Sequence, residues 1–186
     1  DEAAGKVTGY TRANRGGVPD NFHNWFVIEP GVPIIDSGTW SRGAWVKLDT
    51  GESGVAEVKT ASSFISTEQA LLNLSSEVGE SGFDDVMAEA KAAWNEELGR
   101  IKVSGGTIEE RATFYSCLYR VLLFPRKFYE HREDGTPYYY SPYDGKIHDG
   151  HMYTDNGFWD TFRAVFPFFT LMYPEFDERI MGSLVA

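Results

Sequence analysis

One carboxylate and one guanidinium lie within an aromatic stretch near the end of the sequence. The segment YTDNGFWDTFRAVFPFF, residues 153–169, carries Asp160 and Arg163 three positions apart, and Trp159 directly precedes the acid. Side chains three and four positions apart are neighbours on one face of a helix, so a helix here would let these three side chains converge. Two interpretations stay open: a surface ion pair beside a core tryptophan, or a cluster that binds a monosaccharide.

The sugar-binding interpretation follows from what these side-chain types do. A carboxylate beside a guanidinium stays ionised, and an ionised Asp160 can accept hydrogen bonds from two hydroxyl groups at once. Arg163 can donate to a hydroxyl or ring oxygen. Trp159 offers a flat face on which the C–H face of a pyranose can stack. Together these are the parts of a monosaccharide subsite.

Other patterns that carry chemistry are weaker. His148 and His151 lie three apart in the run HDGH, but zinc needs two more ligands, for which Asp149 or Asp155 are the candidates. The alternative is a pair of solvent-facing loop histidines. No G-x-S-x-G, phosphate-binding loop or G-x-G-x-x-G motif occurs. The single cysteine, Cys117, excludes an internal disulfide, and its apolar neighbours predict a small buried residue.

Composition narrows the class of protein. The chain has 186 residues, 42% hydrophobic and 24% charged, as in a soluble globular protein with one domain or parts of two. Its net charge of −11, without a cluster of Lys and Arg, argues against a nucleic-acid partner. No stretch has the length of a membrane span. The polar start and the apolar, helical end suggest a segment of a longer protein.

The first third of the chain predicts strands. Residues 1–60 alternate β-branched and aromatic residues with Gly, Pro and Asp turns. The run GAWVKLDTGESGVAEVKTASSFI, residues 43–65, predicts an antiparallel hairpin around DTGESG, in a sheet with one solvated face. Three tryptophans in this region, Trp25, Trp40 and Trp45, are predicted to pack in the core of the strand region.

After residue 65, the spacing of the apolar residues changes to that of a helix. Ser66 and Gln69 form a capping-box pattern, as do Thr107 and Glu110. Between them, apolar residues recur at three- and four-residue steps and predict an amphipathic helix in which Trp94 packs. The members of this stripe are Phe83, Val86, Met87, Ala90, Trp94 and Leu98.

A polar, tyrosine-rich segment separates these helices from the last ones. Residues 126–153 contain several turn signals and predict a small hairpin of PYYYS against KIHDG. We also consider that Tyr138, Tyr139 and Tyr140 line a cleft, since alternate strand residues face opposite sides. The next helix is predicted to begin near Thr154–Asn156. Strands followed by helices predict two domains joined by a helical linker, not an alternating parallel sheet.

Four segments, taken in order, resemble glycoside hydrolase family 92, the exo-acting α-mannosidases. They are SSFISTEQALLNLSSEV, FDDVMAEAKAAWNEELGRIKVSGGT, RATFYSCLYRVLLFP and YTDNGFWDTFRAVFPFFTLMYPE. The resemblance covers residues 60–186 and is more diffuse before them. It implies an N-terminal antiparallel β-sandwich that ends in residues 1–60, a helical linker over 61–106, and the first helices of an (α/α)6 catalytic barrel over 107–186.

The resemblance also implies a function. Members are calcium-dependent inverting enzymes that remove terminal α-linked mannose from oligosaccharides and glycoprotein glycans, and they are usually exported from the cytoplasm. Trp159 and Asp160 would contact the terminal mannose, and Arg163 would contact it or orient Asp160. The general acid, the base and the calcium ligands would lie in the remaining C-terminal part of the protein, so we assign none of them here and expect this segment alone to be inactive.

Two alternatives to a mannosidase stay open. The chain could be a non-catalytic carbohydrate-binding or structural module, in which the aromatic residues and Asp160 bind sugar or only pack. It could also belong to another (α/α)-barrel glycosidase, trehalase-like or glucoamylase-like, because the run Trp159–Arg163 is not unique to mannosidases. The helical segments between Ser62 and Pro125 favour the mannosidase family.

Overall fold

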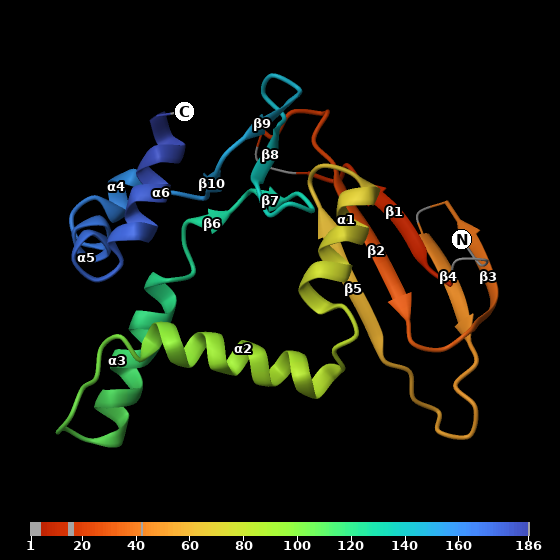
Figure 1. Ribbon diagram of the computed structural model, residues 1–186, viewed down its shortest axis with the longest axis horizontal. Coiled ribbons are helices and arrows are strands. Elements are labelled where there is room, and N and C mark those ends of the chain that lie inside the picture. Colours follow the sequence, from red (N-terminus) through yellow and green to blue (C-terminus); the bar gives the residue numbers. More distant parts are fainter. Residues whose placement is uncertain (1–4, 15–16, 42, 186) are drawn as a thin grey trace. The chain divides into compact units, whose positions relative to one another are not determined.

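The computed structural model describes residues 5–14, 17–41 and 43–185 (Figure 1). The chain divides into two compact units. Unit 1 contains residues 1–86, 130–135 and 140–147, and unit 2 contains residues 87–129, 136–139 and 148–186. The predicted combination of sheets followed by helices is confirmed, with short strands between the helices in addition.

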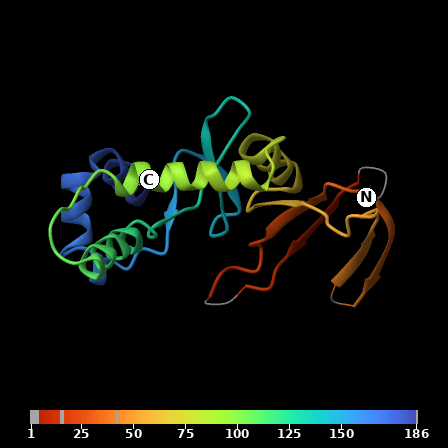
Figure 2. The same ribbon diagram turned by 90° about the horizontal axis from the view of Figure 1, so that it is seen from below.

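Two antiparallel sheets form most of unit 1. The first has the strand order β1-β2-β5 and the second pairs β3 with β4. Figures 1 and 2 show β3 and β4, in orange, as a separate two-stranded sheet beside the three-stranded sheet. The bounds are β1 Val7–Thr11, β2 Asn24–Pro30, β3 Ile34–Trp40, β4 Gly43–Leu48 and β5 Val58–Ser63.

The predicted hairpin around DTGESG is wrong. β4 pairs with β3, the strand before it in the chain, and β5 pairs with β2 in the other sheet. The sequence between β4 and β5 does not close a hairpin: Gly51 and Gly54 both have positive φ and lie in a long turn. Which strands pair depends on contacts between residues that are distant in the sequence. The alternation of apolar and polar residues within one strand does not specify these contacts.

Helix α1, Thr67–Asn73, covers the three-stranded sheet and continues into a π-helical turn, η1, Leu74–Val78. Val27 of β2 is fully buried against Ala70 and Leu74. The predicted cap is confirmed, because the Ser66 hydroxyl accepts a hydrogen bond from the Gln69 N–H at 3.1 Å. That bond satisfies one of the N–H groups that a helix start leaves without a partner.

A polar network ties β7, Glu130–His131, to the sheet side of unit 1. One carboxylate oxygen of Glu130 accepts the Phe64 N–H at 2.8 Å, and the other accepts the Asn73 side-chain amide at 2.7 Å. Gln69 is buried, and it donates to the Asn73 side chain and to the His131 carbonyl at 2.8 Å each. Because all these partners are satisfied, the network adds to stability despite its burial.

The Tyr-rich segment contains the predicted hairpin. Strand β8, Pro137–Ser141, lies between β7 and β9, Lys146–Asp149, in a three-stranded sheet. Tyr139 is buried and stacks on His148 with ring centroids 5.4 Å apart. The Tyr140 hydroxyl accepts a hydrogen bond from the Asn21 side chain at 2.9 Å. That these tyrosines line a sugar cleft stays a prediction.

Unit 2 is mainly helical. Its core contains Tyr153, Phe169, Tyr173 and Ile180, which are all buried. The helices are α2 Phe83–Leu98, α3 Ile108–Val121, α4 Phe158–Thr161, α5 Val165–Met172 and α6 Pro174–Val185, and the boundary between the units falls in the first turn of α2. A two-stranded sheet pairs β6, Arg126–Lys127, with β10, Tyr153–Thr154.

The helix ends follow local signals. The predicted capping box before α3 is confirmed: Thr107 accepts from the Glu110 N–H at 3.1 Å, and the Glu110 carboxylate accepts from the Thr107 N–H at 2.7 Å. Pro167 does not break a helix, since it lies in the first turn of α5, where proline is tolerated. Pro174 is the first residue of α6, and α5 ends two residues before it.

Several predicted core residues are exposed. Cys117 lies on α3 and is exposed, so its predicted burial is wrong. Trp40 and Trp45 are 58% and 46% exposed, which contradicts a core position, and Trp25 is half-buried. Helical and strand periodicity identifies an apolar face, but it does not identify which residues cover that face. Trp94 does pack, with its ring centroid 4.5 Å from that of Tyr119.

Much of the apolar surface of α2 is exposed as well. Phe83 and Met87 are 71% and 55% exposed, and no residue of this helix is buried. Within the described ranges, no helix is both long enough and apolar enough to cross a membrane.

The Glu130 network gives a stability prediction. Replacing Glu130 by Ala leaves the Phe64 N–H and the Asn73 amide without their acceptor, and each unsatisfied buried donor costs about 1–3 kcal/mol. We expect a loss of about 2–4 kcal/mol in the free energy of unfolding, measured by urea denaturation, and faster hydrogen exchange of the Phe64 amide. The matched control is Glu133→Ala, at an exposed glutamate three residues later. An unchanged exchange rate at Phe64 in Glu130→Ala would contradict the role of the network.

Candidate functional site

The turn from β10 into α4 positions the aromatic segment that the sequence singles out. Tyr153 is 5% exposed and packs in the core of unit 2, and its neighbour Thr154 pairs with Arg126 of β6. Arg126 also donates through two guanidinium nitrogens to one carboxylate oxygen of Asp155. These contacts fix the backbone on both sides of the turn.

Asp155 has an unusual backbone conformation. The backbone angle φ of Asp155 is +63°. Among the described residues, Asp155 is the one non-glycine residue whose φ is positive. Asp is one of the few residues that tolerate this region, and its ion pair with Arg126 compensates for the conformational cost. The predicted helix start at Thr154–Asn156 is therefore wrong: Thr154 still belongs to a strand, and α4 begins at Phe158 after the left-handed residue.

A short network caps the start of α4. Gly157 is the N-cap residue, and its carbonyl accepts hydrogen bonds from the Thr161 N–H at 3.0 Å and the Thr161 hydroxyl at 2.9 Å. The same hydroxyl lies 3.3 Å from the Asn156 side-chain oxygen, so its single hydrogen is shared between this oxygen and the Gly157 carbonyl. Thr161 thereby holds the four-residue helix against the turn, which sets the direction of the side chains on α4.

Trp159 and Arg163 meet as their spacing predicts. The guanidinium carbon of Arg163 lies 4.7 Å from the ring centre of Trp159 and 5.0 Å from that of Phe162, so the cation is placed over two aromatic rings. Trp159 is still 58% exposed. The arrangement leaves much of the indole surface open to a ligand and orients the guanidinium beside it.

Asp160 lies next to this pair but is not joined to Arg163. No ion pair connects the two side chains in the described part of the chain, because Arg163 lies over the rings instead. The Asp160 carboxylate folds back over the helix start: a Cβ added to Gly157 would lie 2.8 Å from its Oδ2 atom. Asp160 is exposed. The exposed residues Asp160 and Trp159 therefore both lie in the first turn of α4.

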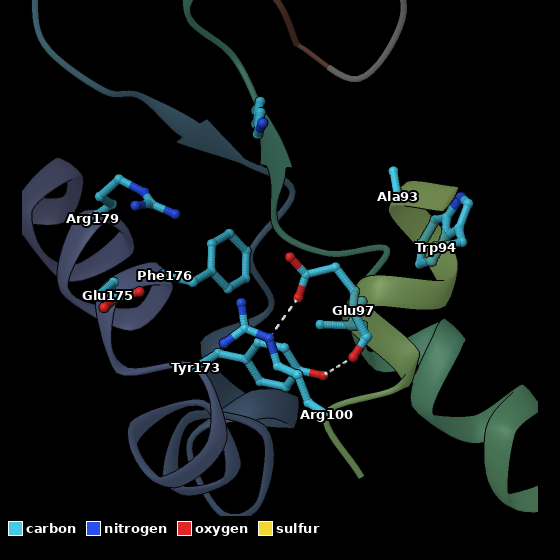
Figure 3. Close-up of a pocket in the computed structure, with 10 residues that line it drawn as sticks. Ala93, Trp94, Glu97, Arg100, Tyr173, Glu175, Phe176 and Arg179 are labelled. Carbon is cyan, nitrogen blue, oxygen red and sulfur yellow. Dashed lines mark hydrogen bonds and ion pairs between the residues drawn. The ribbon is translucent and has the colours of Figure 1, made fainter. Parts of the chain in front are cut away.

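A pocket of about 280 Å³ lies elsewhere in unit 2 (Figure 3). It does not include Trp159, Asp160 or Arg163. Its lining combines aromatic and aliphatic side chains with cations and acids from α2, β6 and α6. The lining residues are Ala93, Trp94, Glu97, Arg100, Leu122, Lys127, Tyr173, Glu175, Phe176 and Arg179.

Polar contacts in the pocket are largely internal. Arg100 forms an ion pair with Glu97 at 3.0 Å, and its guanidinium carbon lies 4.7 Å from the ring centre of Tyr173. The Tyr173 hydroxyl donates to the Glu97 carbonyl at 3.0 Å, as Figure 3 shows. Since Glu97 and Arg100 satisfy one another, this group connects α2 to the start of α6 and does not provide a free acid for catalysis.

Burial changes the acidity of two phenols near this pocket. It raises the pKa of Tyr173, the nearby Glu97 charge raises it further, and Arg100 opposes the change. Burial also raises the pKa of Tyr129, as does a hydrogen bond with Tyr153. Both phenols therefore keep their protons to a higher pH than exposed tyrosines do.

The histidines considered as metal ligands contact aromatic rings. His148 stacks on Tyr139, and His151 lies edge-on to Tyr129 with ring centroids 4.6 Å apart. Within the described ranges, no group of three or more His, Cys, Asp or Glu side chains is placed to hold a metal ion.

Sequence reasoning missed Arg126 and Asp155, which hold the turn before α4. A signal was present: the run Asp155-Asn156-Gly157 contains residue types that favour turns and positive φ. The partnership with Arg126 could not be read in the same way, because the two residues are 29 positions apart.

Comparison with known proteins gives a consistent family. A family model described as the glycosyl hydrolase family 92 catalytic domain matches residues 69–186, more than half of the chain. An uncharacterized secreted glycosidase from Arthroderma benhamiae is 29% identical over 92 residues, a match that covers 46% of this chain and 12% of that protein.

Solved structures agree with this match. A family GH92 inverting mannosidase from Bacteroides thetaiotaomicron is 49% identical, with a TM-score of 0.93 over 98% of this chain and 27% of its own. A family GH92 α-mannosidase from the same organism is 25% identical, with a TM-score of 0.78 over 96% of this chain and 26% of its own. The second enzyme is also known in complex with mannoimidazole. The chain thus spans about a quarter of the length of these mannosidases.

The buried Tyr173 phenol gives a pH prediction. Its raised pKa means that the unfolded chain loses this proton first as the pH rises past about 10. The contribution of Tyr173 to stability is thus fully present below about pH 10 and is lost as the pH rises through its folded-state pKa. Tyr173→Phe should lower the free energy of unfolding by about 1 kcal/mol at pH 7, through the lost hydrogen bond to Glu97, and should weaken the decline above pH 10.

Urea unfolding between pH 7 and pH 11 measures both effects. The control is Tyr143→Phe, which alters a phenol that is 85% exposed. If Tyr173→Phe and the parent protein lose stability equally above pH 10, the Tyr173 phenol does not contribute to the alkaline transition.

Proposed function

This chain belongs to glycosyl hydrolase family 92, and on that premise we propose that it is part of an α-mannosidase that removes terminal α-linked mannose from glycans. The substrates are mannose-containing oligosaccharides or glycoprotein glycans. Because the chain spans about a quarter of the length of the solved relatives, the activity is proposed for the longer protein, and these 186 residues alone are expected to be inactive.

The observation that carries the proposal is the exposed ring of Trp159 beside the exposed carboxylate of Asp160. A terminal mannose would stack on Trp159 and donate hydroxyl hydrogen bonds to Asp160, which can accept two. Arg163 is held over the indole, and from there it donates to the sugar or limits the positions that Trp159 adopts. Arg126 acts through Asp155 by fixing the turn that precedes this cluster. Trp159, Asp160 and Arg163 bind and orient the sugar and do not transfer its protons.

The catalytic groups are proposed to lie outside this chain. Inverting hydrolysis needs a general acid that protonates the leaving oxygen and a base that activates water, with their carboxyl groups about 6.5–9.5 Å apart. No residue of this chain is assigned either role. We place both in the remaining C-terminal part of the same protein, which would meet this segment at the Trp159–Asp160 cluster.

We propose calcium as a cofactor of the longer protein, without assigning any of its ligands to this chain. Calcium prefers six to eight oxygen ligands, several of them carboxylates. The described residues contain no cluster of acids or histidines that fits such an ion. We therefore assign no calcium ligand to this chain, and no step proposed for its residues depends on the metal.

The proposed architecture follows the order of elements along the chain. Residues 1–60 would complete an N-terminal β-sandwich, residues 61–106 would form a helical linker, and residues 107–186 would begin an (α/α)6 barrel. The support is the set of strands before residue 64 and the helix pairs after it. We propose an extracytoplasmic location, supported by the relative that is named as a secreted glycosidase.

The role of Asp160 can be tested in the longest natural form of the protein. Asp160→Asn keeps the side-chain shape but removes the charged acceptor, and hydrogen bonds to a charged group contribute about 1.5–3 kcal/mol each. We expect kcat/KM for an aryl α-mannoside to fall by about 10²-fold or more. The melting temperature should change little, because Asp160 is exposed.

The matched control is Asp84→Asn, at an exposed acid in the first turn of α2. It should leave kcat/KM and melting unchanged. A large drop in melting temperature for Asp160→Asn, with kcat/KM per folded molecule retained, would show that Asp160 is structural and would favour the alternative of a non-catalytic module.

A further inference from the structure

Two tryptophans in unit 1 lie flat on the ribbon formed by β3 and β4. A Cβ added to Gly38 would lie 2.7 Å from the Trp45 Nε1 atom, and one added to Gly43 would lie 2.5 Å from the Trp40 ring. Each indole thus covers the glycine opposite it on the neighbouring strand, in contact with the backbone. This packing is possible only because glycine has no side chain at those positions.

Both rings lie on the same face of the ribbon. The strand register pairs Gly38 with Trp45 and Trp40 with Gly43, and residues two apart on a strand share a face. Thr39 faces the other side. Since one side of each ring contacts the sheet, the exposed fractions of 58% for Trp40 and 46% for Trp45 come largely from their outer sides.

Two charged residues continue this face beyond the tryptophans. Asp36 and Lys47 are opposite each other in the register, on the same side as the rings, and both are exposed. No ion pair joins them in the part of the chain that the structure describes. One oxygen of the Asp36 carboxylate accepts the Ser37 N–H at 2.9 Å. The face therefore offers the second carboxylate oxygen as an acceptor and the Lys47 ammonium as a donor.

We propose that this face, defined by Asp36, Trp40, Trp45 and Lys47, binds the neutral pyranose units of a glycan. Two exposed rings held flat against a sheet match the C–H faces of successive sugar rings, which are apolar and nearly planar. The adjacent acid and amine suit hydroxyl groups at the edges of such rings. The opposite charges of Asp36 and Lys47 offset one another, and the net charge of −11 on the whole chain disfavours a polyanion.

The face shares no residue with the proposed mannose subsite. Trp159 belongs to unit 2, and Trp40 and Trp45 belong to unit 1. The function of this face would be to hold a glycan at the protein surface, independently of whether the longer protein is a hydrolase. The contacts of the rings also differ. Trp159 lies beside the Arg163 guanidinium, whereas Trp45 and Trp40 lie against Gly38 and Gly43 of the neighbouring strand.

The test measures binding of α-linked mannopentaose to this chain by calorimetry and by tryptophan fluorescence. Replacing Trp40 or Trp45 by Ala should raise Kd by about tenfold each, the effect expected for one lost stacking contact. Gly43→Ala should weaken binding too, because its new Cβ displaces the Trp40 ring while the tryptophan stays. Thr39→Ala, on the opposite side of the two strands, is the control that should retain the parent Kd.

Several results would overturn the proposal. One is a Kd for the Trp40→Ala/Trp45→Ala variant equal to that of the parent, with folding verified by thermal melting. If that variant does not fold, Gly43→Ala decides the matter, and unchanged binding by it contradicts the assignment. Tighter binding of an acidic uronic-acid oligosaccharide than of mannopentaose would exclude the neutral-ligand assignment. Self-association that depends on the two tryptophans, without glycan binding, would identify the face as an interface between copies of the chain.

Discussion

The ion pair between Arg126 and Asp155 is the contact on which the proposed sugar site depends. It stabilises a left-handed residue at the point where β10 ends, and this residue directs the chain into α4. The two side chains are 66% and 37% exposed, so the ion pair acts together with the burial of Tyr153 in holding this turn. Two contacts hold this turn: the packing of Tyr153 in the core of unit 2, and the ion pair between Arg126 and Asp155. A short helix of four residues can thereby present an exposed ring and an exposed acid in a defined orientation.

A similar principle organises the sheet unit, where Glu130 accepts hydrogen bonds from Phe64 and Asn73. Residues far apart in the sequence are joined there by a carboxylate whose two oxygens both have partners. Networks of this kind are stable only when every member is satisfied, so they specify one arrangement of the backbone. The apolar core beneath α1 consists of Val27, Ala70 and Leu74.

Features decided within a few residues could be predicted from the sequence. The Thr107–Glu110 capping box is one, since both partners lie in a single turn, and the contact of Trp159 with Arg163 is another. Features that depend on residues distant in the sequence could not be predicted in this way. Periodicity alone did not reveal that β4 pairs with β3, that Arg126 holds Asp155, or that the Trp40 ring rests on a glycine and remains exposed.

The central claim is that this chain supplies the sugar-binding part of a mannosidase and that its catalytic groups lie elsewhere in the longer protein. The most direct measurement compares hydrolysis of an aryl α-mannoside by these 186 residues and by the longest natural form, each with calcium and with a chelator. The account predicts calcium-dependent release by the long form alone. Release by the short chain, or no release by either form, would contradict it.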